Sequence, residues 1–117
     1  MQKLLLVGGP EFIFKMIGLT GHMHFEVSFA DQTVDSVMRG MSDGRRPDII
    51  VMQNRTVPQW GYSVLRRLRK LNVKTPSIIV VDRIDAETYE HGYVMLFSDR
   101  LTSDTFIAGI HTCTRGP

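Results

Sequence analysis

Polar residues follow the apolar runs of this sequence at places where chemistry could be done. Two amides, Gln53 and Asn54, come directly after one buried-looking run, and Gly8 and Gly9 come after another. An amide oxygen is a poor nucleophile, a hard divalent cation prefers carboxylate oxygens, and glycine has no side chain to offer either. These four positions therefore predict hydrogen bonding and argue against phosphoryl transfer or a metal centre.

The glycine pair could instead act through its backbone. A glycine-rich turn between a strand and a helix can bind phosphate on N–H groups. The spacing of a dinucleotide fingerprint is absent around Gly8 and Gly9, however. We favour the alternative of a tight turn, in which Pro10 begins the following helix.

Charged residues follow the last two apolar runs. Asp82 comes after the fourth run, and Asp99 and Arg100 come after the fifth. The carboxyl ends of strands form the edge where open α/β sheets bind ligands. The three side chains fit either an internally paired cluster that locks a loop or a set of solvated loop charges, and the second interpretation is slightly favoured.

A cationic run contains Arg66, Arg67, Arg69 and Lys70. Clustered positive charge can attract nucleic acid or an acidic protein. A solvated helix face is the commoner explanation of such a run. The net charge of the whole chain is only +2, which is far from that of a dedicated nucleic-acid binder.

Composition indicates one folded domain. The chain has 117 residues, of which 43% are hydrophobic and 22% charged, so residues 1–117 are predicted to form a single domain with its own core. Its single cysteine, Cys113, forms no internal disulfide, which predicts a reducing compartment, the cytoplasm. The apolar runs are too short to span a membrane, and the four scattered histidines predict no metal site.

Five segments have the patterns of β-strands. Residues 4–7, 49–52 and 78–81 are continuously apolar, as in strands covered on both faces of a parallel sheet. Residues 24–29 alternate between polar and apolar and predict a half-buried strand near an edge. The fifth strand is expected at residues 93–97.

Helices are expected between these strands, at residues 11–19, 33–41, 62–71 and 103–112. In the first, Ile13 and Ile17 stand four apart and are expected to share one face. In the last, Phe106, Ile107 and Ile110 are expected on one side. The segment 82–92 has too few apolar residues for a full helix, so a short or irregular fourth helix is predicted.

Alternating strands and helices with right-handed crossovers predict an α/β fold. Five such units at this length favour a doubly wound, five-stranded parallel sheet of flavodoxin-like order 2-1-3-4-5. With that order in place, four parts of the sequence become informative: Pro47-Asp48-Ile49-Ile50-Val51-Met52, Pro58 with Gly61, Leu65-Arg66-Arg67-Leu68-Arg69 and Thr75-Pro76-Ser77-Ile78-Ile79-Val80-Val81. Through these residues the sequence resembles the receiver domain (CheY-like) of bacterial response regulators, over nearly its whole length.

The resemblance implies a site that lacks the residues for phosphorylation. In receivers, an acid pair after the first strand and an aspartate after the third hold a divalent cation, and that aspartate takes a phosphoryl group from a histidine kinase. Here the pair falls on Gly8 and Gly9, and the aspartate falls on Gln53, or on Asn54 if Pro58 anchors the alignment instead of Gly61.

Two further receiver positions have changed type as well. The hydroxyl after the fourth strand falls on Val81, and the lysine and proline after the fifth fall on Asp99 and Arg100. A degenerate pocket, or pseudo-receiver, is therefore expected, with no metal, cofactor or catalytic residue. Trp60, in the loop after the third strand, is expected either to mark a contact surface or to fold back over the pocket.

The function expected from the resemblance is a phosphorylation-independent, non-enzymatic signalling module. It would bind a protein partner or form a homodimer, and it would control transcription through an output domain after residue 117 that alone contacts DNA. Arg66, Arg67, Arg69, Lys70, Arg100 and Trp60 form the candidate interaction surface. The alternative is a flavodoxin-like domain that binds a small molecule at the edge around Gly8, Gln53, Asp82 and Asp99.

Overall fold

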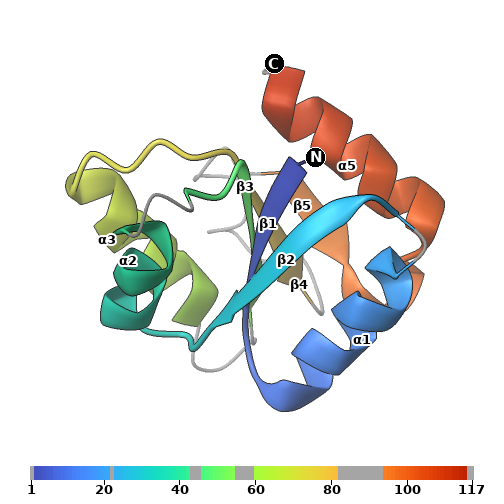
Figure 1. Ribbon diagram of the computed structural model, residues 1–117, viewed down its shortest axis with the longest axis horizontal. Coiled ribbons are helices and arrows are strands. Elements are labelled where there is room, and N and C mark those ends of the chain that lie inside the picture. The colour runs from blue at the N-terminus through green and yellow to red at the C-terminus, as the bar shows by residue number, and fades with distance from the viewer. Residues whose placement is uncertain (1, 22, 43–45, 55–59, 82–93, 116–117) are drawn as a thin grey trace.

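In the computed structural model, five parallel strands form one sheet in the order β2-β1-β3-β4-β5 (Figure 1). The structure describes residues 2–21, 23–42, 46–54, 60–81 and 94–115, with the backbone alone at 60–62 and 115. The strands are β1 (Gln2–Val7), β2 (Phe25–Ala30), β3 (Ile49–Asn54), β4 (Ser77–Val81) and β5 (Val94–Phe97). The predicted strand order and the doubly wound α/β class are confirmed.

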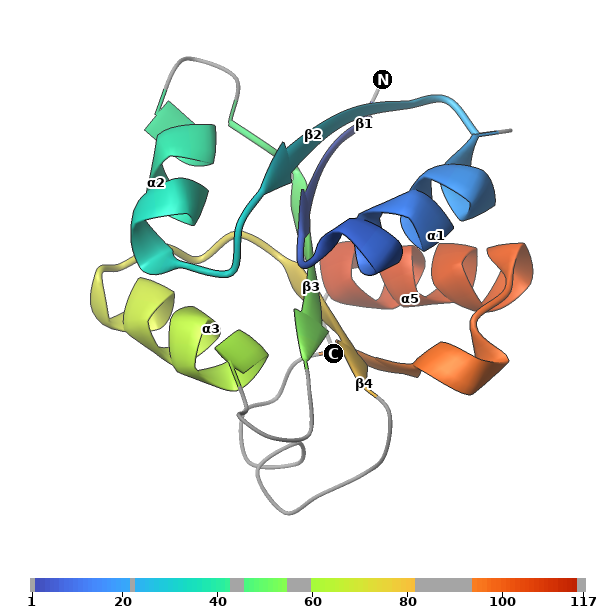
Figure 2. The same ribbon diagram turned by 90° about the horizontal axis from the view of Figure 1, so that it is seen from below.

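Helices cover both faces of the sheet (Figure 2). They are α1 (Pro10–Thr20), α2 (Val34–Ser42), α3 (Trp60–Lys70) and α5 (Ser103–Arg115), and a 3-10 turn, η1 (Ser98–Arg100), follows β5. Helices α2 and α3 lie on one face, and α1 and α5 on the other. Within the described ranges no helix is long and apolar enough to cross a bilayer. The prediction of a short or irregular fourth helix concerns residues outside those described.

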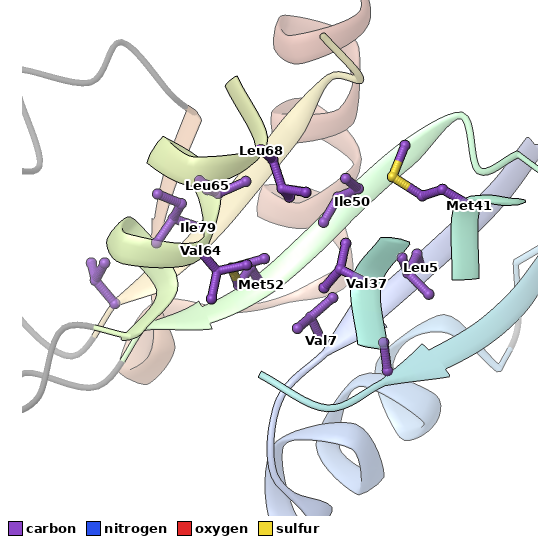
Figure 3. Close-up of a cluster of buried hydrophobic side chains, with 12 residues drawn as sticks. Leu5, Val7, Val37, Met41, Ile50, Met52, Val64, Leu65, Leu68 and Ile79 are labelled. Carbon is purple, nitrogen blue, oxygen red and sulfur yellow. The ribbon is translucent and has the colours of Figure 1, made fainter. Parts of the chain in front are cut away.

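Two buried clusters hold the layers together. On one face Leu5, Val7 and Ile50 of the sheet pack against Val37 of α2 and Leu65 of α3 (Figure 3). On the other face the alternate strand residues pack against α1 and α5; they include Leu4, Leu6, Val51 and Ile78, which meet Met16 and Phe106. The continuous apolar runs are therefore central strands covered on both faces, as their sequence predicted.

The buried face of α1 is offset from the pair Ile13 and Ile17, whose spacing indicated the helix. Phe12 and Met16 are buried, whereas Ile17 is 45% exposed and Ile13 is only partly covered. Both pairs have the same spacing of four residues, and α1 carries apolar side chains nearly all round, so its periodicity fits either stripe. Packing against the sheet selects the stripe that contains Phe12 and Met16.

On α5, the set of buried residues differs from the predicted set by one residue. Phe106 and Ile110 are buried, and Phe106 makes an edge-to-face contact with Phe25 of β2 at a centroid distance of 6.3 Å. Ile107 is 40% exposed, so the prediction that it shares their side was wrong. Successive helical residues are about 100° apart around the axis, which turns Ile107 away from the sheet.

The two isoleucines of α5 provide a matched test of this packing. We expect Ile110→Ala to lower the free energy of unfolding by about 2–5 kcal/mol, because it leaves a cavity in the core. Ile107→Ala should cost less than about 1 kcal/mol, because its side chain is partly solvated. Urea unfolding of both variants measures the difference, and equal losses would contradict this assignment of the buried face.

Candidate functional site

The strand register brings the first and third strands together at the carboxyl edge of the sheet. Val7 of β1 pairs with Met52 of β3, so the next residues along, Gly8 and Gln53, stand beside one another. Gln53 in turn pairs with Val80 of β4. Val80 belongs to the cluster under α1 and α5, and the pleat therefore directs Gln53 to the same face.

The side chain of Gln53 fills the space next to the glycine turn. Its Oε1 accepts a hydrogen bond from the backbone N–H of Gly9 at 3.1 Å. A Cβ added at Gly8 would lie 3.0 Å from both Cβ and Oε1 of Gln53 and only 2.5 Å from Cδ2 of Phe12. Gly8 therefore leaves the room that the Gln53 amide and the Phe12 ring occupy.

The backbone of Gln53 is tied to the loop after β2. Nε2 of Gln32 donates to the carbonyl oxygen of Gln53 at 2.8 Å. One residue thus connects the end of β3 with the β1–α1 turn through its side chain and with the β2–α2 loop through its backbone. The only signal for Gln32 in the sequence is weak: it lies in a short polar stretch just before α2.

Asn54 lies on the opposite face of the sheet from Gln53. It pairs with Val81 of β4, and both residues are buried. Val81 packs in the cluster under α2 and α3. Of the two positions that the resemblance left open, Gln53 is the one beside Gly8 and Gly9.

The residues after β5 form the turn η1, and their pairing with Asp82 stays a prediction. Asp99 and Arg100 lie in η1 and are exposed, which agrees with solvated loop charges. Lys15 of α1 donates from Nζ to the carbonyl oxygen of Ser98 at 2.6 Å and so ties this connection to α1. Sequence reasoning missed Lys15, and Asp82 lies outside the described residues.

The cationic run on α3 divides into two parts. Arg66, Arg67 and Lys70 are exposed and line a shallow depression of 360 Å³ together with Leu71. Arg69 is half-buried, and its guanidinium donates to the carbonyl oxygens of Val73 at 2.8 Å and Thr75 at 3.2 Å, both beyond the end of α3. The expectation that all four cations face solvent is therefore corrected for Arg69. Trp60 begins the backbone of α3, and its side chain is outside the described part of the chain.

A depression of 440 Å³ opens beside the glycine turn. It is lined by Gly8, Gly9, Asp31, Gln32, Thr33, Ser63 and Val64. Several of its polar groups already have partners within the chain: Gly9 donates to Gln53, and Oγ1 of Thr33 accepts from the N–H of Ser36 at 3.1 Å. Part of the hydrogen-bonding capacity of the hollow is therefore used within the chain, while Asp31 adds a carboxylate to its lining.

Cys113 is poorly suited to act as a nucleophile. Its side chain is half-buried near the end of α5, and Sγ donates to the carbonyl oxygen of Ile110 at 3.4 Å. Burial raises the pKa of the Cys113 thiol above its ordinary value, and a hydrogen bond with its own backbone lowers it by a smaller amount. The residue stays a protonated thiol at neutral pH, and the thiolate is the reactive form.

Comparison with solved structures identifies the fold. The signal receiver domain of an HD domain-containing protein from Pseudomonas fluorescens matches with a TM-score of 0.78 and 12% identity, over 97% of this chain and 94% of that one. The receiver domain of the Francisella response regulator 1452 matches with a TM-score of 0.76 and 19% identity, over 98% of each chain. The chain has the receiver-domain fold.

The receiver fold also matches within a longer protein. NtrX from Brucella abortus, in complex with ADP, matches with a TM-score of 0.74 and 16% identity over 98% of this chain but only 26% of that one. No protein-family model and no curated protein sequence matches the chain.

The divalent cation implied by the receiver resemblance does not fit the residues present. Gly8 has no side chain, Gly9 donates its N–H to Gln53, and a larger residue at Gly8 would collide with Phe12. Asp31 contributes a carboxylate to the neighbouring hollow, but nowhere in the described ranges do three aspartate, glutamate, histidine or cysteine residues gather into a possible metal site. A hard cation needs several oxygen ligands, and this edge provides amide and backbone groups instead.

Two glycines test the packing of this edge. We expect Gly8→Ala to destabilise the protein by about 1–3 kcal/mol, because the new methyl group overpacks against Phe12 and Gln53. Gly18→Ala is the control: the added Cβ has nothing within 4 Å, and alanine in a helix should stabilise by about 0.5–1 kcal/mol. Opposite signs in chemical denaturation support the assignment, and a neutral or stabilising Gly8→Ala contradicts it.

Proposed function

We propose that this chain is a receiver-like signalling module that works without aspartyl phosphorylation, by binding a protein partner or by self-association. The observation that carries the proposal is the hydrogen bond between Oε1 of Gln53 and the N–H of Gly9. It places a neutral amide, already partnered, beside the two glycines that match the acid pair of receivers.

At the positions that carry out phosphoryl transfer in receivers, this chain has residues that cannot perform those roles. An amide does not attack a phosphoryl donor as a carboxylate does. Val81, at the position that matches the receiver hydroxyl, is apolar and 1% exposed. Asp99, at the position that matches the receiver lysine, carries the opposite charge and is exposed. These differences support a pseudo-receiver and a non-enzymatic role.

Control of such a module has to come from binding. A partner or ligand shifts a conformational equilibrium only by its differential affinity for the two states. The match within NtrX shows the same fold as one part of a longer chain, which supports an input role coupled to a separate output. We expect a cytoplasmic regulator in which any contact with DNA, and hence any control of transcription, is made by that output.

The small-molecule alternative is weaker. The 440 Å³ hollow beside Gly8 and Gly9 is the place where a ligand would bind. Hydrogen bonds within the chain already engage the N–H of Gly9, Nε2 of Gln32 and Oγ1 of Thr33, which leaves fewer groups for a ligand. A site built to recognise a polar ligand usually presents converging, uncommitted groups.

A thermal-shift experiment separates these possibilities. We expect no change in the unfolding midpoint with Mg²⁺ and beryllofluoride, because a ligand that does not bind the folded state cannot stabilise it. A phosphorylatable receiver domain serves as the positive control. Stabilisation of this protein by Mg²⁺ and beryllofluoride would overturn the proposal, and stabilisation by a nucleotide, flavin or metabolite would favour the small-molecule alternative.

A single substitution at the site tests the same proposal chemically. We expect Gln53→Asp to remain unphosphorylated by a small-molecule phosphoryl donor with Mg²⁺, because Gly8, Gly9 and Val81 still supply no oxygen ligand or hydroxyl. Intact-protein mass spectrometry measures the incorporation, with Gln53→Asn as the control for folding. Addition of a phosphoryl mass to the Gln53→Asp variant contradicts this account.

A further inference from the structure

Helix α1 carries a second apolar stripe that the fold leaves uncovered. Phe14 is 81% exposed and Ile17 is 45% exposed, and Ile13 next to them is only partly covered. The described charges on α1 are Glu11 and Lys15, and Lys15 is bound to the carbonyl oxygen of Ser98. A helix that is apolar nearly all round is expected to be covered on more than one side.

Strand β2 extends this apolar surface. Phe29 is 54% exposed and pairs in register with Leu6, whose side chain lies in the cluster under α1, so Phe29 points to the α1 face. Phe14 and Phe29 line one depression of 440 Å³, together with Ile13 and Ala30. We call Ile13, Phe14, Ile17 and Phe29 the α1–β2 patch.

The α1–β2 patch adjoins an edge of the sheet. β2 is the first strand in the order β2-β1-β3-β4-β5, so among the described strands it has a partner on its β1 side alone. In Figure 2 it lies at the upper edge of the sheet, and in Figure 1 it lies in front of the other strands, with no described element beyond it. An edge strand presents backbone N–H and C=O groups that can pair with another strand, and Glu26 is the one charged residue among its six.

The sequence of β2 is close to a palindrome. Its first five residues are Phe25-Glu26-Val27-Ser28-Phe29. In an antiparallel pair of two copies centred on Val27, Phe25 stands opposite Phe29 of the partner subunit, and Glu26 stands opposite Ser28 of the partner subunit. Aromatic cross-strand pairs are favourable, and no like charges meet.

Other symmetric registers are less favourable. Side chains of directly opposed residues must lie on the same face of the sheet, so a two-fold axis has to pass through a residue position. An axis at Glu26 would place two carboxylates opposite one another, and an axis at Ser28 would lose the pair between Phe25 and Phe29. The register centred on Val27 is therefore the one that the side chains favour.

We propose that two copies of this chain pair antiparallel along β2, about a two-fold axis at Val27, and that Phe14 and Phe29 of each copy form the apolar core of the interface. In this arrangement the carboxyl end of one β2 strand lies beside the amino end of the other. The sheet then continues through the axis as ten strands, and the α1 helices of both copies lie on the same face.

The exposed area is sufficient for a weak dimer. Phe14 and Phe29, at 81% and 54% exposure, present roughly 270 Å² of ring surface per copy, taking about 200 Å² for a whole aromatic side chain. Stable interfaces bury about 800 Å² per partner, of which a central apolar part carries most of the affinity. The two rings supply about a third of that area and the paired strand edges add to it, so the dimer is expected to be reversible and to depend on protein concentration.

This inference rests on the proposed function, because self-association would replace phosphorylation as the controlling event. The proposed function and the proposed dimer can nevertheless be disproved separately. Binding of Mg²⁺ and beryllofluoride bears on the missing phosphorylation site, whereas the mass in solution bears on the β2 interface alone.

Sedimentation velocity over a concentration series tests the dimer. The mass should rise from that of one chain toward that of two, and Phe29→Lys should weaken the dimer at least about tenfold, because it replaces a central aromatic ring with a charged side chain. Leu71→Lys, at a residue 53% exposed beyond α3, is the matched control and should leave the dimer unchanged. A protein that stays monomeric at every concentration, or equal weakening in both variants, overturns the proposal.

Disulfide trapping tests the register in a Cys113→Ser background. In the proposed pair the two copies of residue 27 lie directly opposite, with Cα atoms about 4.5–5.5 Å apart, which is within the range of a disulfide. Val27→Cys should therefore cross-link on oxidation, and Ser28→Cys, displaced along both strands, should not. No cross-link at residue 27, or equal cross-linking at both positions, overturns the register, and circular dichroism confirms that each variant is folded.

Discussion

One hydrogen bond determines the geometry of the candidate site in this receiver-fold protein. The N–H of Gly9 donates to Oε1 of Gln53, and the Gln53 side chain thereby occupies the space over Gly8. A buried polar group is costly without a partner, and here the side-chain amide and the turn satisfy one another. The bond joins β1 and β3 at the edge where parallel α/β sheets usually meet ligands, so the geometry of that edge is fixed from within the chain.

This arrangement changes how signalling can operate. A receiver that is phosphorylated gains charge at the end of β3, whereas this edge is neutral at both Gly8 and Gln53. Under the proposed function, a change of state comes from contacts on the outside of the domain, where differential affinity for two conformations or two assemblies provides the free energy. The exposed features point the same way: the α1–β2 patch is apolar, and α3 presents Arg66, Arg67 and Lys70.

The two surfaces lie on opposite faces of the sheet and differ in chemistry. The α1–β2 patch adjoins a free strand edge, so backbone hydrogen bonds and apolar burial can act together there. The α3 surface is cationic around Leu71, and such a surface mainly attracts and orients an acidic partner. One domain can therefore associate with itself through one face while the other face remains accessible.

The sequence by itself determined the class of fold. Three continuous apolar runs require strands covered on both faces, and the helical segments between them require crossovers, which leaves few topologies besides the order that is observed. It also determined what is missing from the site, because glycine and amide side chains lack carboxylate chemistry wherever they are placed. Only the tertiary structure decided between near-equivalent neighbours. It shows that Met16, and not Ile17, is buried on α1, and that Gln53, and not Asn54, lies beside the glycines. It also shows that Arg69 binds the loop after its own helix. Residue type and spacing are nearly the same for each alternative, and packing against the sheet, which depends on residues far away in the chain, selects one of them.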